Sequence, residues 1–318
     1  MQGQDISRLH RYQGCLLGLA CGDALGTSVE FSRRGQFEPL TDIRGGGPFG
    51  LLPGQWTDDT SMALCLAESL LECGGFDARD QMERYCHWWL GGHLSSTGLC
   101  FDIGSTVLAA LERFRRTGEP LSGSENPRSA GNGSLMRLAP VVLFFSPGSS
   151  MAVELIKRML DMAEFSSRTT HAAPECVDAC RYFAWLLHLA LAGHSLEQVL
   201  ANRAFQARTP AVQAIMGGDW INKPVSEICG SGYVMASLEA ALWCVYHHRT
   251  FEGAILAAAN LGDDADTTAA IAGQLAGALY GIKGIPAGWR GKVWMHTYLH
   301  QQAERLLQEG ASAGRDQE

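Results

Sequence analysis

Three aspartates within four residues interrupt a strongly apolar part of this chain. Asp263, Asp264 and Asp266 lie between the mainly apolar run 257–261 and a second apolar run at 269–272. A buried carboxylate is unfavourable unless it is paired, protonated or bound to a metal ion. A fold that buries this region must therefore supply a compensating charge.

The neighbouring chain supplies no such charge, because no Lys or Arg lies between Arg249 and Lys283. A cation held by oxygen ligands is the expected alternative, and such ligands favour Mg²⁺, Mn²⁺ or Ca²⁺. A second acidic cluster, Thr-Asp-Asp-Thr at residues 57–60, has the same mixture of carboxylates and hydroxyls. We predict that the two clusters meet in space and hold a metal centre.

Each acidic cluster also has a purely structural explanation, namely helix capping. Thr57 and the aspartates that follow it would suit the start of one helix, and Asp264 and Asp266 would suit the start of another. Capping requires one such residue, whereas each cluster contains several beside an apolar helix. The pair therefore favours metal binding. The Asp-Ala-Asp-Thr order resembles the start of a calcium loop, but the glycine and glutamate of that loop are missing at the required offsets.

The composition is that of a soluble globular protein with a large core. The 318 residues are 46% hydrophobic and 18% charged, and we expect one compact domain over residues 1–310 followed by a flexible tail at 311–318. The formal charge of −8 disfavours a nucleic-acid-binding surface. Ten cysteines without a CxxC pair, and neither a signal peptide nor an uninterrupted apolar span, indicate a cytoplasmic protein with free thiols and no membrane segment.

Helical periodicity dominates the chain, and convincing β-strand alternation is missing. The run 141–145 is strand-like, but a buried helix explains it equally well. Loops rich in glycine occupy residues 32–55 and 122–133. The expected fold class is all-α, a compact single-domain helical bundle with a central metal site. The predicted helices cover residues 7–27, 57–73, 78–90, 102–116, 151–165, 174–192, 195–203, 231–247, 250–260, 266–281 and 292–309.

Two of these helices carry glycines at four-residue spacing. The glycines are residues 14, 18, 22 and 26 in the first helix and residues 273, 277 and 281 in the helix after the second acidic cluster. Each glycine lowers helix propensity by roughly 1 kcal/mol relative to alanine. The compensating benefit is close approach of another backbone. We predict that the two helices are central and pack closely on each other.

Four further features have an ordinary explanation beside a functional one. His171 suits a structural role, and the glycine-containing residues 131–134 suit a plain turn as well as an approach to phosphate oxygens. Tyr233 suits the edge of a core, and Asp102 suits a helix cap. The residues alone leave both interpretations of each feature open.

Together these stretches resemble the ADP-ribosylglycohydrolase family, and in particular the group that contains dinitrogenase reductase-activating glycohydrolase. The resemblance extends in family order from near residue 14 to about residue 281. The matching stretches are 18–31 (GLACGDALGTSVEF), 56–60 (WTDDT), 132–137 (NGSLMR), 170–171 (TH) and 262–268 (GDDADTT).

The resemblance implies a compact all-α bundle with a binuclear Mg²⁺ or Mn²⁺ site. Asp263 stands where relatives often carry glycine, so it is not counted as a ligand. The positions that match the family's metal ligands are Thr57, Asp58 and Asp59 in the first cluster and Asp264, Asp266 and Thr267 in the second.

The resemblance also implies roles for the isolated residues. Asn132, Gly133 and Ser134 match the segment near the diphosphate of ADP-ribose, His171 matches a position near the distal part of the ligand, and Tyr233 would stack on the adenine. Catalytic work would fall to Asp58 and Asp59, with two further acidic candidates. Asp102 matches a position close to the reacting ribose, and Glu30 matches a position that interacts with metal or substrate in some relatives that act on serine-linked ADP-ribose.

The expected function is therefore metal-dependent hydrolysis of the bond between ADP-ribose and a modified protein side chain, with arginine preferred over serine. The expected partners are the ADP-ribosylated protein as substrate and ADP-ribose as product, and the default oligomeric state is a monomer. Acceptor specificity is expected in the loops at 32–55 and 91–101. The alternatives are an immunity protein against an ADP-ribosylating toxin, or a catalytically silent binding or structural protein with the same fold.

Overall fold

The computed structural model describes residues 6–313, and α-helices without a β-sheet make up this part of the chain. The all-α prediction is confirmed. The helices are α1 Arg8–Gly26, α2 Asp58–Glu72, α3 Ala78–Gly91, α4 Ser105–Thr117, α5 Ala139–Phe145, α6 Val153–Arg168, α7 Pro174–Leu191, α8 Leu196–Ala201, α9 Pro210–Gly217, α10 Val234–His247, α11 Phe251–Ala259, α12 Ala265–Tyr280, α13 Ala287–Lys292 and α14 His296–Ala313.

Most predicted helices are present with displaced ends. The helix predicted at 102–116 begins at Ser105, because Asp102 has a left-handed backbone with φ 56°. The helix predicted at 292–309 begins only at His296, after Met295 with φ 48°, and α13 before it was not predicted. The strand-like run 141–145 lies in α5, and α9 was not predicted. Helix α14 extends to Ala313, and the remainder of the predicted tail lies outside the described residues.

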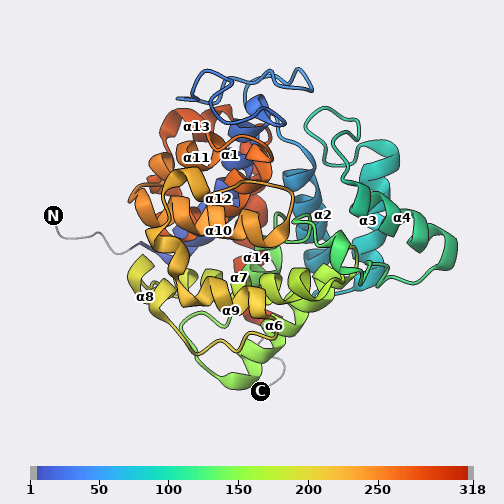
Figure 1. Ribbon diagram of the computed structural model, residues 1–318. Coiled ribbons are helices and arrows are strands. Elements are labelled where there is room, and N and C mark those ends of the chain that lie inside the picture. The colour runs from blue at the N-terminus through green and yellow to red at the C-terminus, as the bar shows by residue number, and fades with distance from the viewer. Residues whose placement is uncertain (1–5, 314–318) are drawn as a thin grey trace.

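The glycine-bearing helices α1 and α12 form the centre of the molecule, as predicted from their spacing (Figure 1). A Cβ atom added to Gly22 would lie 2.1 Å from the carbonyl oxygen of Ala269, and one added to Gly273 would lie 2.1 Å from that of Gly18. Only glycine permits this backbone separation. The close approach brings the C-terminal end of α1 beside the N-terminal end of α12.

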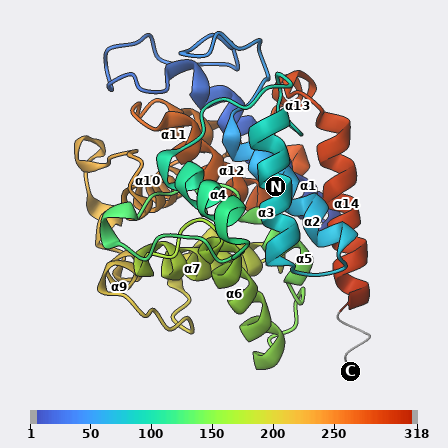
Figure 2. The same cartoon turned by 90° about the vertical axis from the view of Figure 1, so that its right-hand side faces the viewer.

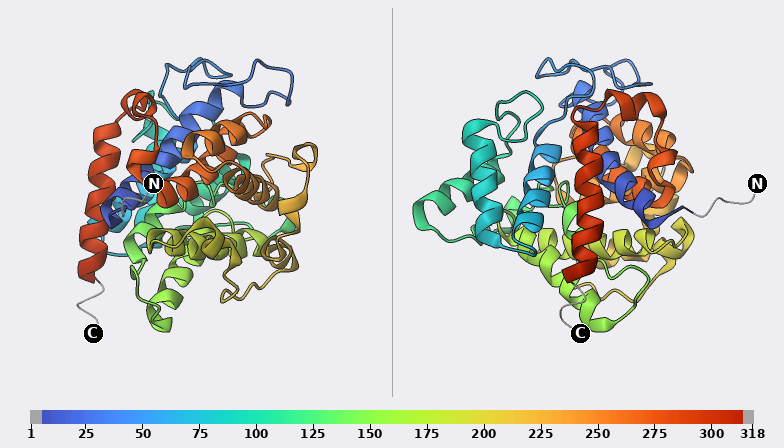
Figure 3. Two further views of the ribbon diagram at one scale, coloured as in Figure 1. Left: turned by 90° about the vertical axis from the view of Figure 1, so that its left-hand side faces the viewer. Right: turned by 180° about the vertical axis from the view of Figure 1, so that it is seen from behind.

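The other helices surround this pair. Helix α14 lies along the back of the bundle, against α1, α2 and α5 (Figure 3). The long segment between α1 and α2 crosses one end of the bundle, and α3 and α4 form a separate layer on one side (Figure 2). That layer encloses a small second core with α2, built around Met82, Tyr85 and Leu111. Within residues 6–313, the helices are all too short or too polar to cross a membrane.

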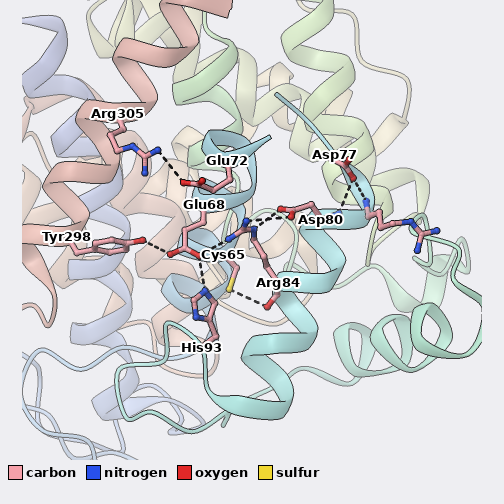
Figure 4. Close-up of polar contacts among 10 residues, drawn as sticks. Cys65, Glu68, Glu72, Asp77, Asp80, Arg84, His93, Tyr298 and Arg305 are labelled. Carbon is pink, nitrogen blue, oxygen red and sulfur yellow. Dashed lines mark hydrogen bonds and ion pairs between the residues drawn. The ribbon is translucent and has the colours of Figure 1, made fainter. Parts of the chain in front are cut away.

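A partly buried polar network joins α2, α3 and α14 (Figure 4). Glu68 accepts hydrogen bonds from Arg84 at 3.0 Å and from Tyr298 at 2.5 Å, and its Oε2 lies 2.8 Å from Nε2 of His93. Arg84 also reaches Asp80 at 2.6 Å. Burial acts to raise the pKa of Glu68, but the Tyr298 and His93 hydrogen bonds and the charge of Arg84 outweigh it and lower that pKa. The network therefore links the three helices to one another through side-chain hydrogen bonds and ion pairs.

Candidate metal centre and substrate cleft

Asp23 of α1 organises the beginning of α2. Its carboxylate is fully buried and accepts hydrogen bonds from the backbone N–H of Thr57 at 2.8 Å and of Thr60 at 3.0 Å. It also accepts the Thr60 hydroxyl at 2.6 Å. A carboxylate from another helix therefore caps α2. Asp23 was not among the predicted site residues, although it lies inside the glycine-spaced stretch 18–31 that carries the family resemblance.

The capping explanation is wrong for the two N-cap side chains, because neither bonds to its own helix. Asp58, Asp59 and Asp266 do lie in the first turns of α2 and α12, as that explanation expected. Thr57 and Asp264 occupy the N-cap positions of α2 and α12 without a capping hydrogen bond. The Thr57 hydroxyl lies 3.0 Å from Asp23 instead, and Asp264 accepts a bond from Asn132 at 2.7 Å. Both side chains therefore bond to residues of other segments rather than to their own helix.

The two acidic clusters meet, as predicted. Oγ1 of Thr57 lies 3.3 Å from Oδ2 of Asp266, and Oγ1 of Thr267 lies 3.3 Å from Oδ1 of Asp59. Carboxylate oxygens of Asp23, Asp59 and Asp266 lie within 4.8 Å of one another. Residues separated by some two hundred positions therefore form one cluster at the ends of α1, α2 and α12.

A second carboxylate group lies beside the first and shares one member with it. Oxygens of Glu30, Asp102 and Asp266 also lie within 4.8 Å of one another. Glu30 is buried, and its Oε2 has no hydrogen-bond partner. Its position follows from the short 3₁₀ turn η1 Thr27–Val29, which carries the chain from α1 toward Asp102. The two groups form one continuous acidic site.

The buried, mutually repelling carboxylates of this site favour a bound cation. Burial, followed by repulsion from neighbouring carboxylates, raises the pKa of Asp58, Asp59 and Asp266 well above the ordinary value. Burial raises the pKa of Asp23 to about 6 despite four hydrogen bonds that lower it. Such groups would be protonated or repelled in the absence of a counter-charge. An all-oxygen donor set with an unpartnered glutamate oxygen suits a hard divalent cation.

The acidic site opens into a cleft of about 380 Å³. Its floor contains four of the acidic candidates, and one wall is the loop that contains Gly133. His171 lies on the same wall. The residues of the sequence analysis that line the cleft are Glu30, Asp58, Asp102, Asn132, Gly133, His171, Asp264 and Thr267.

Two candidate substrate residues lie beside the cleft rather than in its lining. The Ser134 side chain is buried, and its oxygen accepts a hydrogen bond from Ser167 at 2.9 Å. Tyr233 is 43% exposed and donates its hydroxyl to Glu175 at 2.7 Å. A backbone bridge with Gly131 nevertheless holds Tyr233 at the edge of the cleft.

Strained backbone surrounds the acidic site. Phe31, Asp102 and Asp263 have φ values of 62°, 56° and 54°, in the left-handed region that favours glycine. Asp263 is exposed and bonds through its backbone to Phe31 and Ser32. Its exposure is in keeping with its exclusion from the predicted ligands. Asp102 belongs to the cluster, and its strained conformation marks it as a functional candidate.

Comparison with known proteins agrees with this geometry. A family model described as ADP-ribosylglycohydrolase matches residues 4–316. The chain belongs to the ADP-ribosylglycohydrolase family. This membership confirms the resemblance carried by the two acidic motifs.

Individual members of the family cover nearly the whole chain. Tri1 of Pseudomonas putida, named an ADP-ribosylarginine hydrolase, is 44% identical over 94% of this chain and 78% of its own length. The ADP-ribosyl-[dinitrogen reductase] glycohydrolase of Rhodospirillum rubrum is 33% identical over 96% of this chain and 97% of its own. A solved structure titled ADP-ribosylglycohydrolase-related protein complex matches with a TM-score of 0.82 and 41% identity, over 95% of this chain and 99% of that one.

Proposed function

We propose that this protein is a metal-dependent hydrolase that releases ADP-ribose from a modified arginine side chain. The observation that carries this proposal is the convergence of the two acidic clusters at the floor of an open cleft. Relatives at 44% and 41% identity, both named ADP-ribosylarginine hydrolase, support arginine as the acceptor. The ten free cysteines support the cytoplasm as its location, and we propose a monomer.

Two divalent cations, Mg²⁺ or Mn²⁺, fit the two carboxylate groups that share Asp266. The residues that would hold them are Thr57, Asp58, Asp59, Asp264, Asp266 and Thr267, with Glu30 beside them. When bound, such ions lower the pKa of coordinated water and orient hydroxyl groups of a sugar.

The carboxylates of the chain would serve the reaction itself. Cleavage of a glycosidic bond develops positive charge at the anomeric carbon, which the acidic floor stabilises. Burial, followed by repulsion from Asp23 and Asp264, raises the pKa of Asp102 to about 7. This value applies without a metal ion. As a cleft-lining carboxyl group, Asp102 is placed to act as a general acid or base. Asp102 or Glu30 would transfer a proton, to the departing guanidine or from the attacking water.

The rest of the cleft would bind the nucleotide. Asn132, Gly133 and Ser134 would lie along the diphosphate, where glycine allows the backbone to approach phosphate oxygens. His171 would face the distal part of the ligand. Tyr233, half exposed at the edge, would stack on the adenine.

The test is hydrolysis of an arginine-ADP-ribosylated protein by the purified chain with Mn²⁺. Asp58→Asn should reduce kcat/KM by at least about a thousandfold, because the variant loses a charged group at the cluster. Asp263→Gly is the matched control, since it removes a neighbouring carboxylate that is exposed and relieves a left-handed backbone. It should retain activity within about twofold.

Two outcomes would overturn the proposal: a wild-type protein that binds Mn²⁺ but releases no ADP-ribose, or full activity in Asp58→Asn. The first outcome would favour the catalytically silent or immunity alternative. Calorimetric titration with Mn²⁺ distinguishes it from a preparation that has simply lost the metal site.

A further inference from the structure

Arg137 is a fully buried cation whose partners are neutral groups. Its Nη1 donates to the carbonyl of Gly133 at 2.6 Å, and its Nη2 donates to the hydroxyl of Thr170 at 2.7 Å. The guanidinium also lies over the ring of Tyr85, 4.8 Å from its centroid. Burial of a charge is costly, so this arrangement needs a reason beyond packing. The two short hydrogen bonds connect Arg137 to Gly133, which lines the cleft, and to Thr170, which precedes the cleft-lining His171.

Thr170 connects Arg137 to His171. The Thr170 Oγ1 that accepts from Arg137 lies 2.8 Å from Nδ1 of His171. A guanidinium only donates, whereas a hydroxyl has one proton and can accept as well. Accepting from a cation polarises the hydroxyl and makes it a better donor. Within the described residues, Thr170 Oγ1 has no hydrogen-bond partner besides Arg137 and His171, so its own proton is satisfied only by donation to Nδ1. Nδ1 is therefore the acceptor nitrogen of the ring.

His171 is held as a neutral imidazole. Burial, followed by the positive charge of Arg137, lowers its pKa to about 3. A neutral ring that accepts at Nδ1 carries its single proton on Nε2. The ring edge that contains Nε2 faces Gly131 and Gly133, which line the cleft together with His171. A Cβ atom added to Gly131 would lie 3.3 Å from Nε2, and one added to Gly133 would lie 3.2 Å from it.

Arg137 orients the cleft loop in the same way. The Gly133 carbonyl points into the core at the guanidinium. The carbonyl and the following N–H of a trans peptide unit point in opposite directions, so the N–H of Ser134 points away from Arg137. A single buried cation thereby fixes the orientation of one peptide unit and the proton of one imidazole.

We propose that Arg137 and Thr170 are positioning residues that hold His171 in the Nε2–H form, so that the cleft presents a neutral N–H donor to an oxygen of the ligand. The identity of that ligand, ADP-ribose, rests on the proposed function. The direction of the relay, from Arg137 through Thr170 to His171, does not.

The experiment is nitrogen NMR of protein whose histidine rings carry the ¹⁵N isotope, in the wild type and in Thr170→Val. Calorimetry of ADP-ribose binding accompanies it. The His171 signals are identified by their loss in His171→Gln. The wild type should show a proton on Nε2 and a hydrogen-bonded, unprotonated Nδ1. In Thr170→Val the Nδ1 signal should move to that of a nitrogen without a donor, and the ADP-ribose Kd should rise about tenfold. Thr170→Ser keeps the hydroxyl and should retain both properties.

Thr169→Val is the matched control. The Thr169 hydroxyl is equally buried and donates to the Ser166 carbonyl at 2.7 Å. It accepts from Gln81 at 3.2 Å and, at the long distance of 3.5 Å, from Arg137, but it makes no hydrogen bond to His171. This variant should leave the His171 spectrum unchanged and the Kd within about twofold. A wild-type spectrum with the proton on Nδ1, or a Thr170→Val protein with unchanged Nδ1 and Kd, would overturn the inference. A wild type that shows the expected spectrum but binds no ADP-ribose would contradict the proposed function and leave the relay intact.

Discussion

Gly133 and His171 approach each other so closely that position 133 has no room for a side chain. A Cβ atom there would lie 2.8 Å from Cε1 of His171, and the imidazole is fixed from behind by Thr170. A contact of this kind forces one of the two groups to move, at a typical cost of 1–3 kcal/mol. The close approach therefore has consequences for both the loop and the histidine.

Gly133→Ala should reduce ADP-ribose affinity by about tenfold or more, because the added methyl group displaces His171 or the loop. Isothermal calorimetry measures the effect. Gly104→Ala is the control, since Gly104 also lines the cleft and a Cβ atom there would meet no atom within 4 Å. Equal affinities for the two variants would show that the cleft wall tolerates a side chain at 133.

At the scale of elements, the contact between α1 and α12 determines where the acidic residues lie. The carbonyl of Ala269 occupies the space that a side chain at position 22 would need. Asp23 is the next residue in α1, and Asp266 lies one turn before Ala269 in α12. Separation of the helices would therefore also separate the carboxylates.

Gly22→Ala should destabilise the protein by about 3 kcal/mol, at the upper end for an overpacked core, because a backbone atom cannot rotate away. The variant should also bind Mn²⁺ more weakly, since Asp23 and Asp266 move apart. Thermal melts and calorimetry measure the two effects. Gly75→Ala, where a Cβ atom would lie in open space, should change neither. A stable Gly22→Ala protein with normal Mn²⁺ affinity would refute the role of this contact.

The two loops expected to control acceptor specificity meet at the cleft mouth. Phe49 packs against Phe31 with ring centroids 6.4 Å apart and against Phe101 at 5.1 Å. Phe31 lines the cleft, yet it is 67% exposed in a left-handed backbone conformation. Aromatic faces attract guanidinium groups, and the acidic floor favours a cation.

Phe31→Ala should raise KM for an arginine-ADP-ribosylated protein by about tenfold, because the acceptor side chain loses its aromatic neighbour. The Kd for free ADP-ribose should stay within about twofold, since that ligand lacks the acceptor. Val153→Ala, which trims a 72% exposed residue that lines a different pocket, should leave both values unchanged. A parallel loss of ADP-ribose affinity in Phe31→Ala would assign the ring to the nucleotide rather than the acceptor.

At the scale of the whole molecule, stability depends on whether the carboxylates have a counter-charge. Without a metal ion, burial raises the folded-state pKa of Asp23 from 3.8 to about 6 and of Asp102 to about 7. The folded protein then binds more protons than the unfolded chain between these values, so its free energy of unfolding falls as pH rises from about 4 to 7. Metal binding reverses the sign, because ligands must be deprotonated.

In EDTA the melting temperature should therefore fall as the pH rises over this range. The increase in melting temperature on adding Mn²⁺ should be larger at higher pH. At a concentration of a hundred times Kd the ion should add about 2.7 kcal/mol. Asp266→Asn should melt higher than the wild type in EDTA, since it relieves repulsion, and should lose the Mn²⁺ response. A melting temperature independent of Mn²⁺ at all pH values would exclude the metal centre.

The sequence by itself determined the class of fold and the chemical character of the site. Helical periodicity is local, and so is the spacing of glycines such as Gly22, which requires a close neighbour wherever the helix lies. Clusters of carboxylates in an apolar context, such as Asp58 and Asp59, require a counter-charge whatever their surroundings. These features can be recognised in the sequence because each one constrains the structure of its own segment.

Only the tertiary structure decided which side chains cooperate. Asp23 caps a helix whose N-cap residue lies 34 positions later, and Arg137 controls His171 through Thr170. Each of these residues is ordinary within its own segment, and its role arises from the distance to a partner far along the chain. That distance is set by how the helices pack, and the packing depends on all of the contacts in the bundle at once.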